Sequence, residues 1–182
     1  MTKIYLIGIP GCGKTTLGKR AATLLSLPFF DTDQMAVSKI GGIEPLDPFR
    51  PKFHQQMYYA QIESISEIAA MDDTAIIATG AEVALIPSCV KDMKSSGIII
   101  LLDRKPELAK RDISNTQGPR WVMVGTDNNP DRSLSELATE EYFRDIHAYR
   151  SLCDYKIENN GTEDEGTAQL TDIIRREIDL RK

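Results

Sequence analysis

The residues best suited to chemistry stand near the start of the chain, where a short apolar run leads into a glycine-rich turn. Positions 8–16 read Gly-Ile-Pro-Gly-Cys-Gly-Lys-Thr-Thr, which has the Gly-x-x-x-x-Gly-Lys-Thr spacing of a P-loop. Glycine lets the backbone take positive φ and lie against phosphate oxygens, so that consecutive N–H groups at a helix N-terminus attract an anion. The pattern predicts a nucleoside triphosphate site made by Gly8, Gly11, Cys12, Gly13, Lys14, Thr15 and Thr16.

Two side chains of this turn have predicted roles of their own. The Lys14 ammonium would bring positive charge to the β- and γ-phosphates, and the Thr15 hydroxyl could ligate Mg²⁺. A glycine-rich turn between a strand and a helix could instead bind nothing. The complete spacing, with an apolar strand before it and a helical segment after it, favours the nucleotide site.

A pair of carboxylates, Asp31 and Asp33, follows the next apolar run. Residues two apart on a strand point to the same side, so both carboxylates could face the phosphates. One could hold Mg²⁺, and the other could orient or deprotonate an attacking hydroxyl. The alternative is that Asp31 only caps the following helix and that Asp33 is solvated.

The order of apolar and helical segments predicts the scaffold that holds these groups. Strands are expected at 3–9, 29–33, 74–79, 97–102 and 155–158, and helices at 14–25, 34–40, 52–71, 81–94, 106–113, 134–149 and 167–180. Alternation of this kind requires parallel crossovers. We therefore expect an α/β fold, a three-layer α/β/α sandwich with a five-stranded parallel sheet, in a single domain over 1–182. Ligands bind beyond the carboxyl ends of such strands, where the P-loop, Asp31, Asp33 and Gly80 would meet.

The composition restricts the class of protein further. With 182 residues, 41% of them hydrophobic, the chain fits one globular domain. A net charge of −5 argues against a nucleic-acid binder, and no apolar run approaches the roughly 20 residues that cross a bilayer. Three cysteines without Cys-x-x-Cys spacing are expected to be free thiols of a cytoplasmic protein. We expect a monomer with neither nucleic acid nor membrane as partner.

These motifs resemble the shikimate kinase family, whose architecture is that of P-loop, nucleoside-monophosphate-kinase-like proteins. The resemblance rests on the P-loop with its Leu-Gly-Lys-Arg continuation and on Leu-Pro-Phe-Phe-Asp-Thr-Asp at 27–33. It continues in order and spacing through Thr-Gly-Ala-Glu-Val at 79–83, the segment 106–111, Asn-Thr-Gln-Gly-Pro at 115–119, and Tyr149.

The resemblance implies an ATP-dependent, Mg²⁺-dependent kinase that phosphorylates a small hydroxylated, anionic molecule. It implies a substrate-binding region at about 33–71 and a closing lid at about 114–133, a stretch whose prolines, glycines and lack of periodicity also suit a lid. It further implies that Asp33 contacts the acceptor hydroxyl, that Asp31 helps to place Mg²⁺, and that Arg111 lies against the adenine.

The acceptor side departs from the family pattern. The Phe-Arg pair that grips a carboxylate is Phe53-His54 here, and the glycine triplet is reduced to Gly80. The lid arginine is replaced by Gly118, and the arginine before the family's tyrosine is replaced by Asp145. Each lost arginine removes charge-assisted hydrogen bonds worth about 1.5–3 kcal/mol.

Other residues could take over these contacts. We expect Asp33, His54, Gly80 and Arg144 to contact the acceptor, and Arg120 to oppose charge on the transferred group as a catalytic residue, with Arg50 as a further candidate. The acceptor is then shikimate or a related polyhydroxylated acid.

Two alternatives remain open at this stage. The segment 44–50 faintly resembles a loop of gluconate kinase, which would make the chain a carbohydrate kinase. The missing arginines would also suit a nucleotide-binding regulatory or switch protein that has lost its acceptor. The retained Lys14, Thr15, Asp31 and Asp33 favour a kinase over a switch.

Overall fold

The computed structural model describes residues 2–41, 51–114 and 144–180. Five parallel strands form one sheet in the order β2-β3-β1-β4-β5. Their bounds are β1 Lys3–Ile7, β2 Phe29–Asp31, β3 Ala75–Ala78, β4 Gly97–Asp103 and β5 Tyr155–Glu158. The predicted five-stranded parallel sheet is confirmed.

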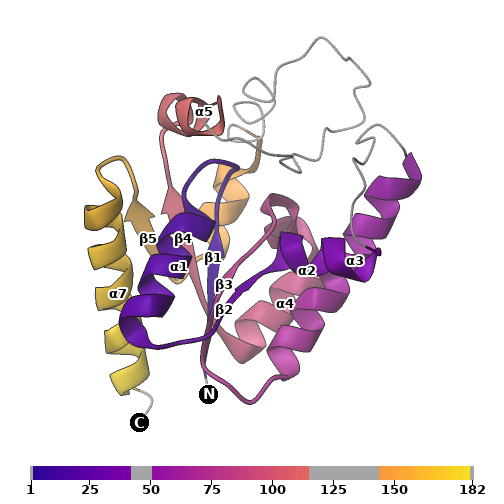
Figure 1. The fold of residues 1–182 in the computed structure, drawn as a ribbon, viewed down its shortest axis with the longest axis horizontal. Helices are drawn as coiled ribbons and strands as arrows, with labels where there is room; N and C mark the ends of the chain where they lie inside the picture. Colours follow the sequence, from indigo (N-terminus) through magenta and orange to yellow (C-terminus); the bar gives the residue numbers. More distant parts are fainter. Residues whose placement is uncertain (1, 42–50, 115–143, 181–182) are drawn as a thin grey trace.

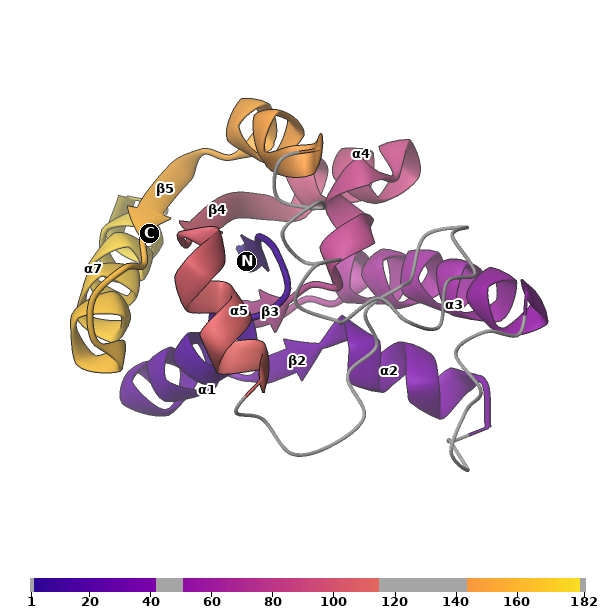
Figure 2. The same ribbon diagram turned by 90° about the horizontal axis from the view of Figure 1, so that it is seen from above.

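Helices cover both faces of this sheet. Their bounds are α1 Lys14–Leu25, α2 Thr32–Lys39, α3 Pro51–Ala70, α4 Pro87–Ser96, α5 Pro106–Ser114 and α7 Glu163–Leu180, with a 3₁₀ helix, η1, at Ala81–Leu85 and a helical segment at 144–152. In Figure 1, α1 and α7 lie on one side of the sheet and α3 and α4 on the other, and Figure 2 shows the same layers from above. The fold is the predicted three-layer α/β/α sandwich of a P-loop protein.

The central strands are apolar because both of their faces are covered. Every residue of β1 and β3 is buried, and β1 lies between β3 and β4, with Ile4 paired to Ile76 on one side and to Ile98 on the other. A parallel strand at this place cannot alternate polar and apolar residues. Packing of these buried central strands holds their carboxyl ends in place, and the candidate site lies at those ends.

Several helix boundaries differ from the sequence-based expectation, and three of the differences have a clear local cause. The helix predicted at 34–40 begins at Thr32, because the Asp31 side chain caps it and the strand stops there. The single helix predicted at 81–94 is two elements, since the 3₁₀ helix η1 ends at Leu85 and Pro87 opens α4.

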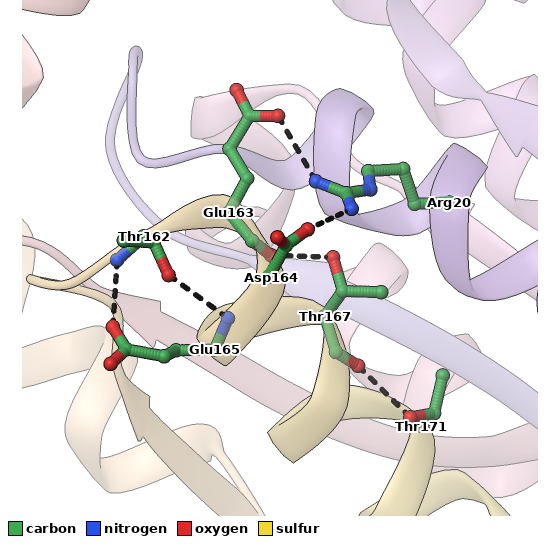
Figure 3. Close-up of polar contacts among 7 residues, drawn as sticks. All are labelled: Arg20, Thr162, Glu163, Asp164, Glu165, Thr167 and Thr171. Carbon is green, nitrogen blue, oxygen red and sulfur yellow. Dashed lines mark hydrogen bonds and ion pairs between the residues drawn. The ribbon is translucent and has the colours of Figure 1, made fainter.

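The last helix, α7, begins at Glu163 instead of the predicted 167 because of a capping box. The Glu165 amide donates to the Thr162 hydroxyl at 3.2 Å, and the Thr162 amide donates to the Glu165 carboxylate at 2.8 Å (Figure 3). Arg20 of α1 contacts Glu163 and Asp164 in the same first turn. The cap therefore holds α7 beside the helix that follows the P-loop.

The predicted lid and the loop at 44–50 lie outside the described residues. Within the described ranges, none of the helices combines the length and the apolar character that crossing a membrane requires.

Candidate active site

The P-loop backbone has the geometry that phosphate binding requires. Gly8, Gly11 and Gly13 have φ of 142°, 76° and 98°. A Cβ on Gly8 would lie 2.7 Å from the Leu102 carbonyl oxygen, so a side chain does not fit there. Gly13 is the N-cap of α1 and provides no side-chain hydrogen bond. The first amides of α1 therefore have no side-chain cap. Uncapped N–H groups at a helix N-terminus can donate to an anion.

Lys14 and Thr15 face two different partners at the start of α1. The Lys14 Nζ donates to the carbonyl oxygens of Gly8 at 2.6 Å and Ile9 at 3.1 Å, so its ammonium lies within the curve of the P-loop. The Thr15 hydroxyl donates to Asp31 Oδ2 at 2.9 Å. This second bond joins the P-loop helix to the end of β2.

Asp31 caps α2 and contacts Thr15 at the same time. Its Oδ1 accepts from the amides of Asp33 at 3.1 Å and Gln34 at 3.3 Å, while its Oδ2 accepts from Thr15. Asp31 therefore caps α2, as the alternative proposed, and also lies beside Thr15 at the P-loop. Asp31 and Asp33 do not share one face of a strand as predicted, because β2 ends at Asp31 and Asp33 belongs to the first turn of α2.

Asp33 lies in a partly buried position between several charged or polar groups. Burial and the charge of Asp31 raise its pKa to about 6, although the Lys14 charge and a hydrogen bond from Gln61 act in the opposite direction. The Gln61 Nε2 donates to Asp33 Oδ1 at 2.5 Å. A carboxyl group with this pKa is mostly ionised at pH 7 and can still take up a proton.

Gly80 brings the end of β3 against this carboxylate. Its amide donates to the Thr32 hydroxyl at 2.9 Å, and a Cβ at Gly80 would lie 2.6 Å from Asp33 Oδ1. The structure thus places Lys14, Thr15, Asp31, Asp33 and Gly80 at one rim of the sheet, as the sequence predicted. Gln61 lies on α3, far from Asp33 in the sequence, and it was not predicted because no motif identifies it.

Two further carboxyl groups, those of Asp145 and Glu82, lie near Arg144 in the predicted acceptor region. The Arg144 Nε and Nη2 each donate to Asp145 at 2.7 Å, and Asp145 is almost completely buried. Burial raises the pKa of the Glu82 carboxyl; the Arg144 charge opposes this rise, and Asp145 and Asp33 add to it. The predicted acceptor contact Arg144 is therefore already paired with a carboxylate.

The described part of the helix at 144–152 reaches this region by a second contact. The Tyr149 hydroxyl donates to the Ala81 carbonyl oxygen at 2.9 Å, directly after Gly80. The segment that bears Arg144 and Asp145 is therefore held against η1. Arg120 and Arg50 lie outside the described residues, as does the side chain of His54, so their predicted roles stay predictions.

A second residue that sequence reasoning missed, Asn159, ties the P-loop to the loops after β4 and β5. Its Nδ2 donates to the Cys12 carbonyl oxygen at 2.8 Å, and its backbone amide donates to the Asp103 carbonyl oxygen at 2.9 Å. Its own carbonyl oxygen accepts from Arg104 Nη1 at 2.5 Å. Asn159 follows β5 directly, so the rule that ligands bind beyond the strand ends could have indicated it.

Arg111, the residue predicted to lie against the adenine, sits on the exposed side of α5. Its side chain is 64% exposed and forms an ion pair with Asp112 at 3.4 Å. Asp112 in turn accepts from Arg104 Nη2 at 2.5 Å. The exposed guanidinium is available for stacking on a base, and the contact itself stays a prediction.

A parallel sheet with a P-loop, a carboxylate beside the P-loop threonine and a second carboxylate two residues later define a phosphotransferase of the P-loop class. The shikimate kinase family model matches residues 10–175. The chain therefore belongs to the shikimate kinase family, as the resemblance predicted. It is a kinase, whose acceptor group is a hydroxyl.

Similar proteins extend over the whole chain. A shikimate kinase of Caldanaerobacter subterraneus is 33% identical over 100% of this chain and 99% of its own length. One of Clostridium botulinum is 33% identical over 94% of this chain and 96% of its own.

Solved structures share the fold at lower identity. Shikimate kinase from Acinetobacter baumannii in complex with shikimate gives a TM-score of 0.78 at 23% identity, covering 100% of this chain and 95% of that one. Shikimate kinase from Bacteroides thetaiotaomicron gives 0.79 at 20% identity, with coverage of 96% and 98%.

Proposed function

We propose that this protein transfers the γ-phosphoryl group of ATP to a hydroxyl of shikimate or a closely related polyhydroxylated acid. The observation that carries the proposal is the position of Asp33, whose carboxylate lies beside Asp31, Lys14 and Gly80 with a pKa of about 6. Phosphoryl transfer between two oxygens needs positioned charge and an oriented acceptor more than covalent help from the protein.

The P-loop residues fit ATP. The uncapped start of α1 and the three glycines with positive φ form an anion-binding turn, and Lys14 lies within it. On binding, the ammonium would exchange its contacts with the loop carbonyls for contacts with the β- and γ-phosphates. Asn159 holds the Cys12 carbonyl from the opposite side, which would keep the loop in shape for the triphosphate.

The donor set also fits Mg²⁺. Thr15 and Asp31 supply a hydroxyl and a carboxylate 2.9 Å apart, both of them oxygen ligands of the kind Mg²⁺ prefers. Among the described residues no group of three or more His, Cys, Asp and Glu side chains forms a metal cage, which agrees with an ion that is held mostly by phosphates and water. Bound there, Mg²⁺ would neutralise charge on the β- and γ-phosphates.

Asp33 would act on the acceptor. Its ionised carboxylate would accept a hydrogen bond from the attacking hydroxyl and would orient it or take its proton as the new P–O bond forms. The region 33–71 would then provide the acceptor site, and the segment 114–133 would close over it as a lid with Arg120 toward the transferred group.

The acid that the site accepts depends on the residues that would bind its carboxylate. The relatives are shikimate kinases, and one of similar fold was solved with shikimate bound. In this chain Arg144 is paired with Asp145, so recognition of a carboxylate would depend on Arg50, Arg120 or His54 as well. A different ring or chain acid with the same hydroxyl pattern would be recognised by the same Asp33.

Release of ADP from ATP and Mg²⁺ tests this function, with shikimate, quinate and gluconate as acceptors and an acceptor-free reaction as the background. We expect shikimate to stimulate release most, with the Lys14→Ala variant at background. Preference for gluconate would identify a carbohydrate kinase. No stimulation by any acceptor, with ATP binding intact, would contradict the kinase and favour a nucleotide switch.

A further inference from the structure

The contact between Gln61 and Asp33 joins two helices at the point where the acceptor is expected. Gln61 lies in the middle of α3 and is 8% exposed, and its Nε2 donates to Asp33 Oδ1 at 2.5 Å. α2 packs against part of the longer helix α3 (Figure 2). The hydrogen bond is thus supported by a packed helix pair instead of a surface loop.

Gly80 makes room for this pair. A Cβ at that position would lie 2.6 Å from Asp33 Oδ1 and 2.6 Å from Gln61 Nε2, so any larger residue would push the two side chains apart. Three elements, α2, α3 and the end of β3, therefore meet at this hydrogen bond. A glycine at position 80 therefore leaves the space that the Asp33–Gln61 pair occupies.

The carbonyl oxygen of the Gln61 side chain shows which contact determines the orientation of this amide group. Its Oε1 is buried and has no hydrogen-bond partner among the residues that the structure describes. A buried carbonyl oxygen without a donor is unfavourable, and a leucine or methionine would fill the same space without it. Turning the amide over would place its carbonyl against a carboxylate. The bond to Asp33 is therefore the feature that keeps a glutamine amide here in this orientation.

We propose that Gln61 is the positioning residue of the acceptor site, which holds Asp33 by Oδ1 so that Oδ2 is presented to the acceptor hydroxyl. This inference rests on the function proposed above, because it assumes that Asp33 acts on the acceptor. An amide is suited to the task, since it donates a hydrogen bond without bringing a charge that would neutralise the carboxylate.

The test replaces Gln61 with methionine, which is similar in size and cannot donate. Gln56→Met is the matched control, because Gln56 is exposed on the same helix. The first readout is the contact itself, followed by ¹H–¹⁵N NMR of the side-chain amide groups without nucleotide or acceptor. We expect the Gln61 amide signal, identified by its loss in Gln61→Met, to shift when Asp33→Ala removes the hydrogen-bond acceptor, while the Gln56 signal, identified by Gln56→Met, stays in place. An unmoved Gln61 signal in folded Asp33→Ala would overturn the proposal.

Kinetics provide the second readout. Loss of one hydrogen bond to a charged group predicts that kcat/KM for the acceptor falls about ten- to hundredfold in Gln61→Met while KM for ATP is unchanged, and that Gln56→Met behaves like the unaltered protein. A purely structural role would affect both substrates. If Gln61→Met does not fold, Gly80→Ala tests the same pair, because its methyl group must displace it. Unchanged acceptor kinetics in folded Gly80→Ala would contradict the geometry.

The two readouts separate this inference from the function on which it rests. If no acceptor is phosphorylated but the Gln61 amide signal shifts in Asp33→Ala, the proposed function fails and the contact stands. If shikimate is phosphorylated and neither readout changes, the function stands and the role of Gln61 is refuted.

Discussion

The predicted phosphate side and the proposed acceptor side of this site are built in different ways. The phosphate side comes largely from one continuous stretch, in which backbone amides, Lys14 and Thr15 are placed by the turn between β1 and α1. The acceptor side is assembled from α2, α3, η1 and the helix at 144–152, and each contributes one or two side chains. The backbone geometry of the P-loop allows little variation on the phosphate side. On the acceptor side, a single substitution can change the net charge of the site. Lys14 lies on the proposed triphosphate side, while Asp145 and Glu82 bring carboxyl groups to the proposed acceptor side.

The largest effect is expected at the centre of the phosphate side. Lys14→Ala removes the only lysine among the predicted phosphate-binding residues 8–16, so we expect turnover to fall by about 10³-fold or more and ATP binding to weaken sharply. ADP release and calorimetry with ATP and Mg²⁺ measure both, with Lys19→Ala on the exposed face of α1 as the control. Near-normal kinetics in Lys14→Ala would remove the P-loop from the mechanism.

The next effect separates the two sides. Asp33→Asn keeps the shape of the side chain but loses the negative charge, so phosphoryl transfer should fall by about 10²-fold or more while ATP affinity is preserved. Rapid-quench measurement of transfer at saturating acceptor isolates this step. Unimpaired transfer would show that Asp33 does not act on the hydroxyl.

Asn159→Ala tests whether a residue far along the chain belongs to the phosphate side. Its loss leaves the Cys12 carbonyl oxygen without the Nδ2 donor, so we expect KM for ATP to rise about tenfold with KM for the acceptor unchanged. Initial rates at varied ATP and varied acceptor give the two constants. A rise in KM for the acceptor alone would show that Asn159 does not support the phosphate side.

The pH dependence is a smaller effect that belongs to the acceptor side alone. Burial raises the folded pKa of Asp33 to about 6, so the carboxylate is protonated below that pH and ionised above it. The kcat/KM for the acceptor should therefore rise with pH through about 6 and then level. Asp33→Asn should lack this limb, and a limb of equal position in that variant would assign the titration to another group.

The smallest effect concerns neither side directly. Thr162→Ala removes the hydroxyl that caps α7, so the free energy of unfolding should drop by about 1 kcal/mol with kinetic constants unchanged. Urea denaturation measures the loss. A fall in turnover that exceeds the fall in folded fraction would mean that the position of α7 reaches the nucleotide site.

The sequence predicted the sheet and the phosphate side well for a physical reason. Buried parallel strands are continuous apolar runs, and the P-loop places its groups by local spacing, so both can be read along the chain. The capping of α2 by Asp31 and the Thr162–Glu165 box were local as well, and they shifted helix starts by only a few residues. Local chemistry was therefore predictable almost to the residue.

Contacts across the fold were not predictable in the same way. Gln61 and Asp33 are far apart in the chain, as are Asn159 and Cys12, and neither glutamine nor asparagine carries a recognisable spacing. The packing of α3 against α2 decides which residue of α3 faces Asp33. Resemblance to the family pointed to Phe53-His54 on that helix, two turns before the residue that makes the contact.

Phosphorus NMR of a reaction with ATP, Mg²⁺ and shikimate tests the central claim most directly, because it follows the phosphoryl group itself. We predict that the γ-phosphate signal of ATP is replaced by the β-phosphate signal of ADP and by one new phosphomonoester signal, and that Asp33→Asn suppresses the change. Formation of inorganic phosphate alone, or an unchanged ATP spectrum with shikimate and every related acid, would contradict the account.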